Sequence, residues 1–138
     1  MKINNEFENN LKTIKELDSL ISNDIIHRDL KPDNILIDKF LFPKITDFGL
    51  AKVINSDQTI LNSQSEFGFK GTTSYSALEV LEKNLFSKAS DIYAFGLIVY
   101  EILTNQELYK DYSFYKVSVE VVSGIRPDLD SDIPDAYK

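Results

Sequence analysis

The sequence predicts an α+β fold that is mostly helical and contains one short β hairpin. Three observations support this prediction: a helical repeat of apolar residues near the N-terminus, two short β-type runs between residues 35 and 46, and a strongly apolar run from Ile92 to Leu103. With 138 residues, 43% of them hydrophobic, the chain can form one core but not two. We therefore expect a single domain.

The first helix is predicted over residues 6–23, because apolar residues recur there at steps of three and four: Phe7, Leu11, Ile14, Leu17 and Ile21. The hairpin follows, with one strand at residues 35–37, a turn at Asp38 and Lys39, and a returning strand at residues 43–46. Residues 55–73 are rich in Ser, Asn, Gln, Gly and Thr, which predicts a long loop.

Two further helices are predicted over residues 88–104 and 113–122. The first is apolar on most of its circumference, which predicts burial of both sides, with a main stripe of Ile92, Phe95, Val99, Ile102 and Leu103 and with Ala94 and Leu97 behind it. Gly96 inside this helix costs ~1 kcal/mol relative to alanine, so we expect a neighbour to pack closely against it.

Composition excludes several classes of function. The formal charge of -7 and a pI near 4.7 argue against a nucleic-acid partner, because an acidic balance does not favour neutralisation of phosphates. The absence of cysteine excludes disulfides and thiolate metal sites and is compatible with a reducing cytosol. The first ten residues have no apolar core of a signal peptide, and the longest apolar run is too short to cross a bilayer. We expect a cytoplasmic protein without a membrane partner.

Two motifs carry the chemistry of the chain. Residues 27–34 read HRDLKPDN, which resembles the catalytic loop of protein kinases, and Asp47-Phe48-Gly49 resembles the metal-binding motif of that family. Asp-Phe-Gly alone often marks a plain turn, and a single histidine such as His27 is usually a packed core residue. The ordered combination of both motifs is much harder to reach by chance.

The resemblance implies transfer of a phosphoryl group from ATP with Mg²⁺ as cofactor. Asp29 would act as the catalytic base, which accepts the proton of the incoming hydroxyl, and Lys31 would contact the γ-phosphate. Asn34 and Asp47 would be the metal ligands, because their oxygens suit the hard Mg²⁺ ion. The predicted hairpin between these two residues would return the second ligand beside the first.

Downstream residues extend the resemblance across an activation segment, residues 47–79, and the helix after it. In the GTTSY run, the Thr72 hydroxyl would bridge Asp29 and Lys31. In the SDIYAFG run, the resemblance implies that Asp91 holds the backbone amides of the catalytic loop. The alternative is a charge at the helix start that the helix dipole favours. The residues with supporting roles would be His27, Arg28, Phe48, Gly49, Thr72, Glu79 and Asp91.

Arg28 would place a positive charge under the activation segment, where a phosphate on that segment could pair with it. The candidate acceptors are Thr59, Ser63 and Ser65, which could equally be ordinary solvated loop residues. Other phosphotransferases with a similar loop, such as the aminoglycoside kinases, lack the GTTSY and SDIYAFG runs, so the resemblance favours protein substrates. Lys31-Pro32-Asp33 resembles the serine/threonine-specific form. Tyr93 and the GIRP run at residues 124–127 resemble the tyrosine-kinase-like branch.

The resemblance covers residues 11–138, which correspond to part of the large, C-terminal lobe of a kinase. The first glycine is Gly49, so no glycine-rich loop precedes the catalytic loop, and we expect the small lobe and the last helices to be absent. Two hypotheses follow. The chain is part of an active serine/threonine kinase, or it is a truncated, inactive module that docks another kinase or a regulator.

Overall fold

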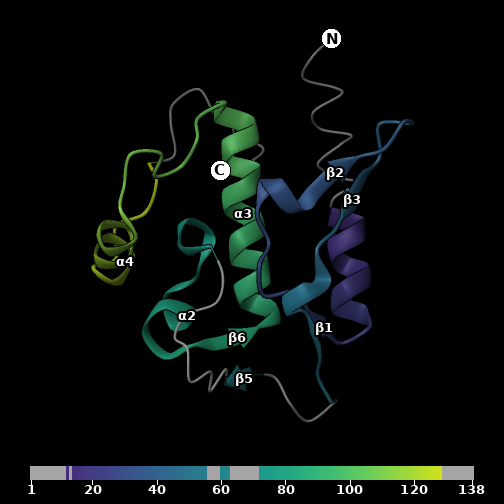
Figure 1. Cartoon of the computed structure of the whole chain (residues 1–138), viewed down its shortest axis with the longest axis horizontal. Helices are drawn as coiled ribbons and strands as arrows, with labels where there is room; N and C mark the ends of the chain where they lie inside the picture. Colours follow the sequence, from purple (N-terminus) through teal and green to yellow (C-terminus); the bar gives the residue numbers. More distant parts are fainter. Residues whose placement is uncertain (1–11, 13, 56–59, 63–71, 129–138) are drawn as a thin grey trace.

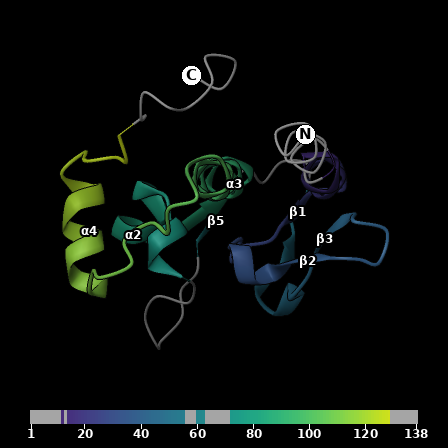
Figure 2. The ribbon, with the colours of Figure 1, turned by 90° about the horizontal axis from the view of Figure 1, so that it is seen from above.

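Helix α3, Lys88–Thr104, lies at the centre of the molecule. The computed structural model describes residues 12, 14–55, 60–62 and 72–128. On one side of α3 lie the β2–β3 hairpin and the helical residues 14–22, and on the other side lie α2, Leu78–Lys83, and α4, Phe114–Val122 (Figures 1 and 2). This arrangement of helices and short antiparallel strands confirms the α+β prediction.

The beginning of α3 is determined by a reciprocal cap. The Ser87 hydroxyl accepts a hydrogen bond from the Ser90 amide at 3.2 Å, and the Ser90 hydroxyl accepts one from the Ser87 amide at 2.9 Å. Two amide donors that a helix start leaves without partners are thereby satisfied. The helix ends at Asn105, whose left-handed backbone, φ 52°, prevents continuation.

The prediction of which side chains α3 buries was right for Ala94 and Leu97 but wrong for the main stripe, in which Phe95, Val99 and Leu103 are only half-buried. The buried side chains are Ser90, Asp91, Ala94, Leu97 and Ile98, whereas Ile92 is 52% and Ile102 is 42% exposed. Gly96 is exposed, and among the described residues no atom beyond its chain neighbours and its own helix backbone lies within 4 Å of the position that a Cβ would occupy there. Because apolar residues surround most of this helix, their spacing cannot identify the inward face.

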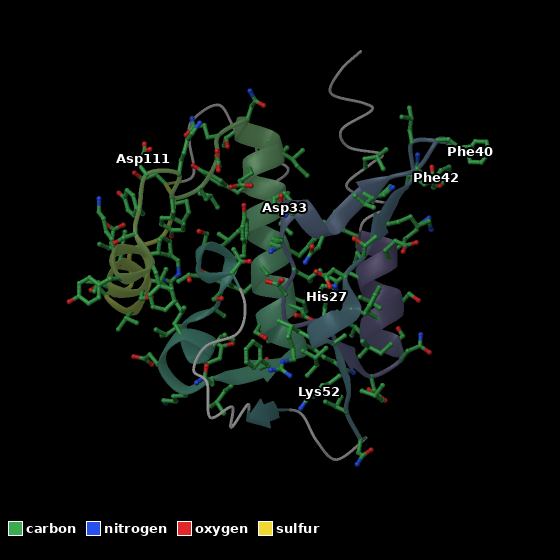
Figure 3. All side chains as sticks on the ribbon, viewed as in Figure 1. His27, Asp33, Phe40, Phe42, Lys52 and Asp111 are labelled. Atoms are coloured by element: carbon green, nitrogen blue, oxygen red, sulfur yellow. The ribbon has the colours of Figure 1, made fainter. Side chains whose placement is uncertain are left out.

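The hairpin forms as predicted. Strands β2, Ile35–Ile37, and β3, Pro43–Ile45, pair antiparallel with Ile35 opposite Ile45. The Asp38 carboxylate accepts hydrogen bonds from the amides of Phe40 and Phe42 at 2.8 and 2.9 Å, which closes the turn. Phe40 and Phe42 project from the tip (Figure 3).

Two further pairs of short strands connect distant parts of the chain. Strand β1, Ile25–Ile26, pairs with β4, Lys52–Val53, on either side of the two motifs. Strand β5, Ile60–Asn62, pairs with β6, Leu85–Ser87. The segment 55–73 was predicted as a loop, so β5 corrects that prediction: backbone pairing with a distant strand overrides its polar composition.

Two apolar clusters hold these elements together. The first joins the N-terminal helix, the loop of residues 27–34, β3 and α3 through Leu17, Leu30, Ile45, Ala94 and Ile98. The second joins β1, the residue after β4, α2 and β6 through Ile26, Ile54, Ala77, Val80 and Phe86. An ion pair of 2.7 Å between Lys44 and Glu16 adds a surface link between the hairpin and residues 14–22. No helix in the described part of the chain has the length and apolarity needed to cross a bilayer.

Candidate active site

The loop of residues 27–34, called the catalytic loop below, is anchored to α3 by Asp91. The Asp91 carboxylate accepts the His27 amide at 2.7 Å and the Arg28 amide at 3.0 Å, and only 3% of this residue is exposed. Burial raises the pKa of Asp91, while the hydrogen bonds from the two amides and the nearby charges oppose that change. Because Asp91 also lies in the first turn of α3, the helix dipole and the anchoring bonds act on the same carboxylate.

Arg28 has a left-handed backbone, with φ 73°, and a buried side chain. Its guanidinium carbon lies 4.4 Å from the ring centroid of Phe86. Burial lowers the pKa of Arg28, and the charge of Asp91 partly offsets this effect. Arg28, the residue directly before Asp29, is therefore held at two points. Its backbone amide binds Asp91, and its side chain stacks on Phe86.

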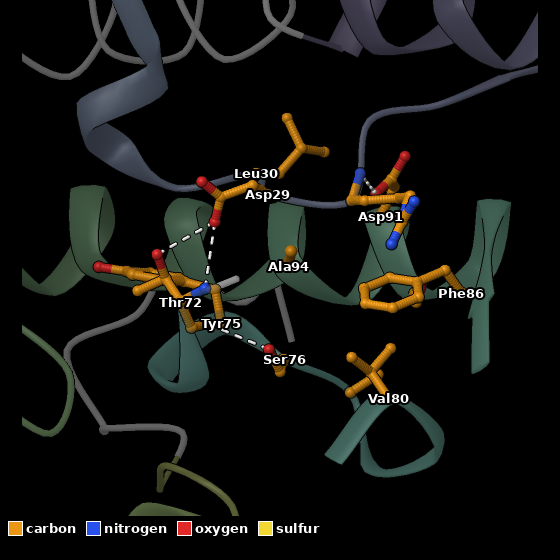
Figure 4. Close-up of a pocket in the computed structure, with 12 residues that line it drawn as sticks. Asp29, Leu30, Thr72, Tyr75, Ser76, Val80, Phe86, Asp91 and Ala94 are labelled. Carbon is orange, nitrogen blue, oxygen red and sulfur yellow. Dashed lines mark hydrogen bonds between the residues drawn. The ribbon is translucent and has the colours of Figure 1, made fainter. Parts of the chain in front are cut away.

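Three side chains converge at the end of the loop. The Thr72 amide and hydroxyl both donate to Asp29 Oδ1 at 3.1 Å (Figure 4). The Lys31 ammonium donates to the same hydroxyl at 3.1 Å and lies 3.5 Å from Asp29 Oδ2. Thr72 thus bridges Asp29 and Lys31, as the sequence analysis expects. The side chain of Asp29 is 13% exposed, so a solvent-side approach to it remains open.

Asn34 connects this cluster to the hairpin. Its Nδ2 donates to the Asp29 carbonyl at 2.8 Å and to Asp29 Oδ2 at 3.3 Å, so the amide oxygen of Asn34 is directed away from Asp29. The backbone carbonyl of Asn34 accepts from the Thr46 amide at 2.8 Å and from the Thr46 hydroxyl at 3.2 Å. Asp47 therefore follows directly after a residue that is bonded to Asn34.

Asp47 is exposed and has a left-handed backbone, with φ 58°. Its Oδ1 accepts the Gly49 amide at 3.3 Å, and a Cβ on Gly49 would lie 3.2 Å from that oxygen, which explains why a glycine suits this position. The donor set fits Mg²⁺: Asn34 and Asp47 offer one neutral and one charged oxygen ligand, and octahedral Mg²⁺ usually takes its other ligands from water and phosphate. The described residues contain no group of three or more His, Cys, Asp or Glu side chains that could hold a metal.

His27 lies beneath both motifs, at the position labelled in Figure 3, and is fully buried. Its Nε2 is 2.9 Å from the Thr46 carbonyl, and its ring meets that of Phe48 edge to face with centroids 5.1 Å apart. Phe48 opens the short η2 turn, Phe48–Leu50. His27 and Phe48 therefore link the catalytic loop to the segment that carries Asp47.

Two residues of this neighbourhood were not predicted from the sequence. Phe86 had no signal, since a phenylalanine in a short strand is an ordinary core residue. Glu101 did have a signal in the sequence, because a charged residue within an apolar helix needs a partner. Its carboxylate accepts the Tyr75 hydroxyl at 2.9 Å and the Leu108 amide at 2.5 Å. Tyr75 belongs to the η3 turn, Thr73–Tyr75, next to Thr72.

Other predicted residues lie apart from this cluster. Glu79 is in the first turn of α2, and within the described residues no cation pairs with its carboxylate. Arg126 donates to the carbonyls of Val121 and Ile125, both at 2.8 Å, and its guanidinium lies 5.7 Å from the ring centroid of Tyr93. The candidate phosphorylation sites Thr59, Ser63 and Ser65 lie outside the described residues.

Comparison with known proteins gives the same family as the motifs. The family model described as the protein kinase domain matches residues 5–134. The chain is 38% identical over 115 residues to dual specificity protein kinase shkA of Dictyostelium discoideum, and the match covers 82% of this chain and 21% of that protein. It is 39% identical over 126 residues to serine/threonine-protein kinase PDK1 of Cryptococcus neoformans, covering 86% of the chain and 10% of that protein.

A third relative is a protein kinase and PP2C-like domain-containing protein of Arabidopsis thaliana, 34% identical over 145 residues, with 86% of the chain and 22% of that protein covered. The chain thus spans between 10% and 22% of the length of these three curated relatives. The family model covers almost the whole chain and includes both motifs and the Asp91 anchor. The chain belongs to the protein kinase domain family.

Proposed function

We propose that this chain carries part of the active site of a serine/threonine protein kinase, which transfers the γ-phosphoryl group of ATP to hydroxyl groups of protein substrates. The observation that carries the proposal is the convergence of Asp29, Lys31 and Thr72 within 3.5 Å of one another, with Asn34 bonded to the same aspartate. Serine/threonine specificity is supported by the KPD sequence after the catalytic aspartate and by the names of several relatives.

In this proposal, Asp29 accepts the hydrogen of the substrate hydroxyl and orients its oxygen toward phosphorus. The Thr72 amide and hydroxyl hold Oδ1 of Asp29, and Asn34 contacts Oδ2, so the carboxylate keeps one rotamer. A positioned base of this kind contributes typically about 10²–10⁴-fold to rate. Lys31 is close enough to Asp29 to place its positive charge on the phosphate that approaches the same carboxylate.

Asn34 and Asp47 are the proposed ligands of Mg²⁺, which when bound neutralises phosphate charge. The amide of Asn34 is oriented for this role, because its nitrogen is engaged by Asp29 and its oxygen is left for a cation. The hydrogen bond from the Thr46 amide to the backbone carbonyl of Asn34 supports this pairing of ligands, because Asp47 is the next residue in the chain after Thr46. The proposal therefore separates a base, Asp29, from a ligand, Asp47.

This separation gives the test. Phosphate transfer from radiolabelled Mg-ATP to serine- and threonine-containing peptides is measured for the wild-type chain and for Asp29→Asn, with nucleotide affinity measured by calorimetry. We expect a loss of transfer of about 10²-fold or more for Asp29→Asn at unchanged Mg-ATP affinity. Asp47→Asn should instead weaken Mg-ATP binding itself.

Asp111→Asn is the matched control, since Asp111 is an exposed aspartate on the opposite side of the molecule from the hairpin (Figure 3). Equal activity of Asp29→Asn and Asp111→Asn would refute the role of Asp29. A folded wild-type chain that transfers no phosphate under any of these conditions would favour the alternative, an inactive binding module.

A further inference from the structure

We propose that Phe86 is a positioning residue of this site, whose ring holds the Arg28 guanidinium and thereby fixes the backbone next to Asp29. This inference rests on the proposed function, because it assigns a purpose to the position of Asp29. It concerns a residue that contacts neither substrate nor nucleotide in the proposal.

The contact is close and buried. Phe86 is the central residue of β6 and is 3% exposed, and the Arg28 guanidinium lies 4.4 Å from its ring centroid. An arginine stacked on an aromatic face is attracted to the π electrons, and this attraction is stronger where water is excluded. Phe86 belongs to the same buried cluster as Ile26 of β1, which lies two residues before Arg28. In Figure 4 it lies with Asp91 at one end of a small pocket, and Asp29 and Thr72 lie at the other.

Arg28 needs such a restraint because of its backbone. A positive φ is unfavourable for a residue with a Cβ, and Arg28 adopts φ 73° directly before Asp29. Asp91 holds the amides of His27 and Arg28, which precede Asp29 in the turn, and the side chain of Arg28 is a second point at which this turn is held. If that side chain lost its support, the peptide leading into Asp29 could relax toward an ordinary conformation.

Phe86 also connects the turn to the activation segment. In the β5–β6 pair, Phe86 stands opposite Leu61, a residue between the Asp47 motif and Thr72. Pairing of the segment with β6 therefore supports the strand that carries the ring. The stacked pair of Phe86 and Arg28 thus links that segment to the catalytic loop, in addition to the direct bonds from Thr72 to Asp29 and Lys31.

The test compares Phe86→Leu with Val80→Ala in the full chain. Both remove apolar contacts from the same buried cluster, but only Phe86 stacks on Arg28. Hydrogen exchange of the His27 and Arg28 amides is measured relative to the Ile98 amide in the core of α3, together with kcat and the peptide KM. We expect Phe86→Leu to speed exchange of both loop amides about tenfold relative to Ile98 and to lower kcat about tenfold with little change in KM.

Val80→Ala should leave the ratio of loop to core exchange unchanged. Phe86→Tyr, which keeps the aromatic face, should restore both readouts to near wild-type values. In the Arg28→Met background, Phe86→Leu should add little, because the two residues act as one pair. Equal exchange ratios in Phe86→Leu and Val80→Ala, or an additive double variant, would overturn the inference. A wild-type chain that transfers no phosphate would bear on the proposed function alone, and the exchange ratios would still decide the role of Phe86.

Discussion

The two ends of α3 each carry a carboxylate that accepts two hydrogen bonds, and they do so in different ways. Asp91, in the first turn, is 3% exposed and accepts two backbone amides, from residues more than 60 positions earlier in the chain. Glu101, near the last turn, is half-buried and accepts one phenol and one amide, from Tyr75 and Leu108. The Asp91 carboxylate therefore binds backbone alone in these contacts, whereas the Glu101 carboxylate binds one side chain and the backbone of the loop that follows α3.

The difference indicates how precisely each partner is positioned. Backbone amides have no rotamers, so the Asp91 contacts fix the start of the catalytic loop directly on the most buried helix. The Tyr75 hydroxyl is carried at the end of a long side chain, and the nearby surface is accessible to water, which can replace a lost bond. We therefore expect the two ends of α3 to differ in the free energy that each set of hydrogen bonds contributes.

The largest effect is expected for Asp91→Ala, which leaves two buried backbone amides without an acceptor. The free energy of unfolding should fall by roughly 3 kcal/mol, because each buried donor left without a partner costs about 1–3 kcal/mol. Urea unfolding at neutral pH measures this loss. Asp111→Ala removes an exposed aspartate and should change stability by less than about 0.5 kcal/mol. If Asp91→Ala lost no more than this control, Asp91 would not be the anchor.

A smaller effect is expected at the other end of the helix. Tyr75→Phe removes one hydrogen bond to Glu101 while the Leu108 amide keeps its own, so the loss should be about 1 kcal/mol. Tyr115→Phe is the matched control, since that ring is 76% exposed. The same urea experiment applies. A loss for Tyr75→Phe as large as that for Asp91→Ala would remove the distinction between the two ends.

The smallest effect concerns alkaline pH. Burial, and then the hydrogen bond and charge of Glu101, raise the pKa of the Tyr75 phenol, and burial raises the pKa of Tyr93 and Tyr109 as well. In the unfolded chain the tyrosine phenol loses its proton at pH ~10, while in the folded chain it retains the proton to higher pH. The contribution of the protonated phenol to the free energy of unfolding is thus complete below the unfolded pKa and is lost as pH rises above it. Unfolding free energies measured from about pH 9 to 11 should decline less steeply in Tyr75→Phe than in wild type. Parallel slopes would contradict this.

Much of the architecture could be predicted because it depends on local signals. The helical period, the Ser87 cap and the left-handed Asn105 define α3 within one stretch of chain, and the predicted range of residues 88–104 agrees with the structure. The hairpin likewise follows from two short β-type runs and the turn at Asp38. These signals involve residues within a few positions of one another, so a single sequence contains them.

The prediction failed where partners are distant in sequence. The inward face of α3 follows from what packs against Ala94 and Ile98, namely Leu17, Leu30 and Ile45, and not from the apolar spacing of the helix. Strand β5 forms because β6, more than 20 residues later, offers a matching edge. In both cases local composition favoured a different structure, and a contact between residues distant in the sequence determined the observed one.

By itself, the sequence determined the family, the fold class and the order of the chemical groups. It could do so because the motifs at residues 27–34 and 47–49 consist of specific residue types at fixed spacings. The tertiary structure alone decided which side chains support those groups. Phe86 on Arg28 and Glu101 on Tyr75 join residues 58 and 26 positions apart. No local pattern specifies such pairs, because their geometry arises only when the helix, the strand and the loop pack together.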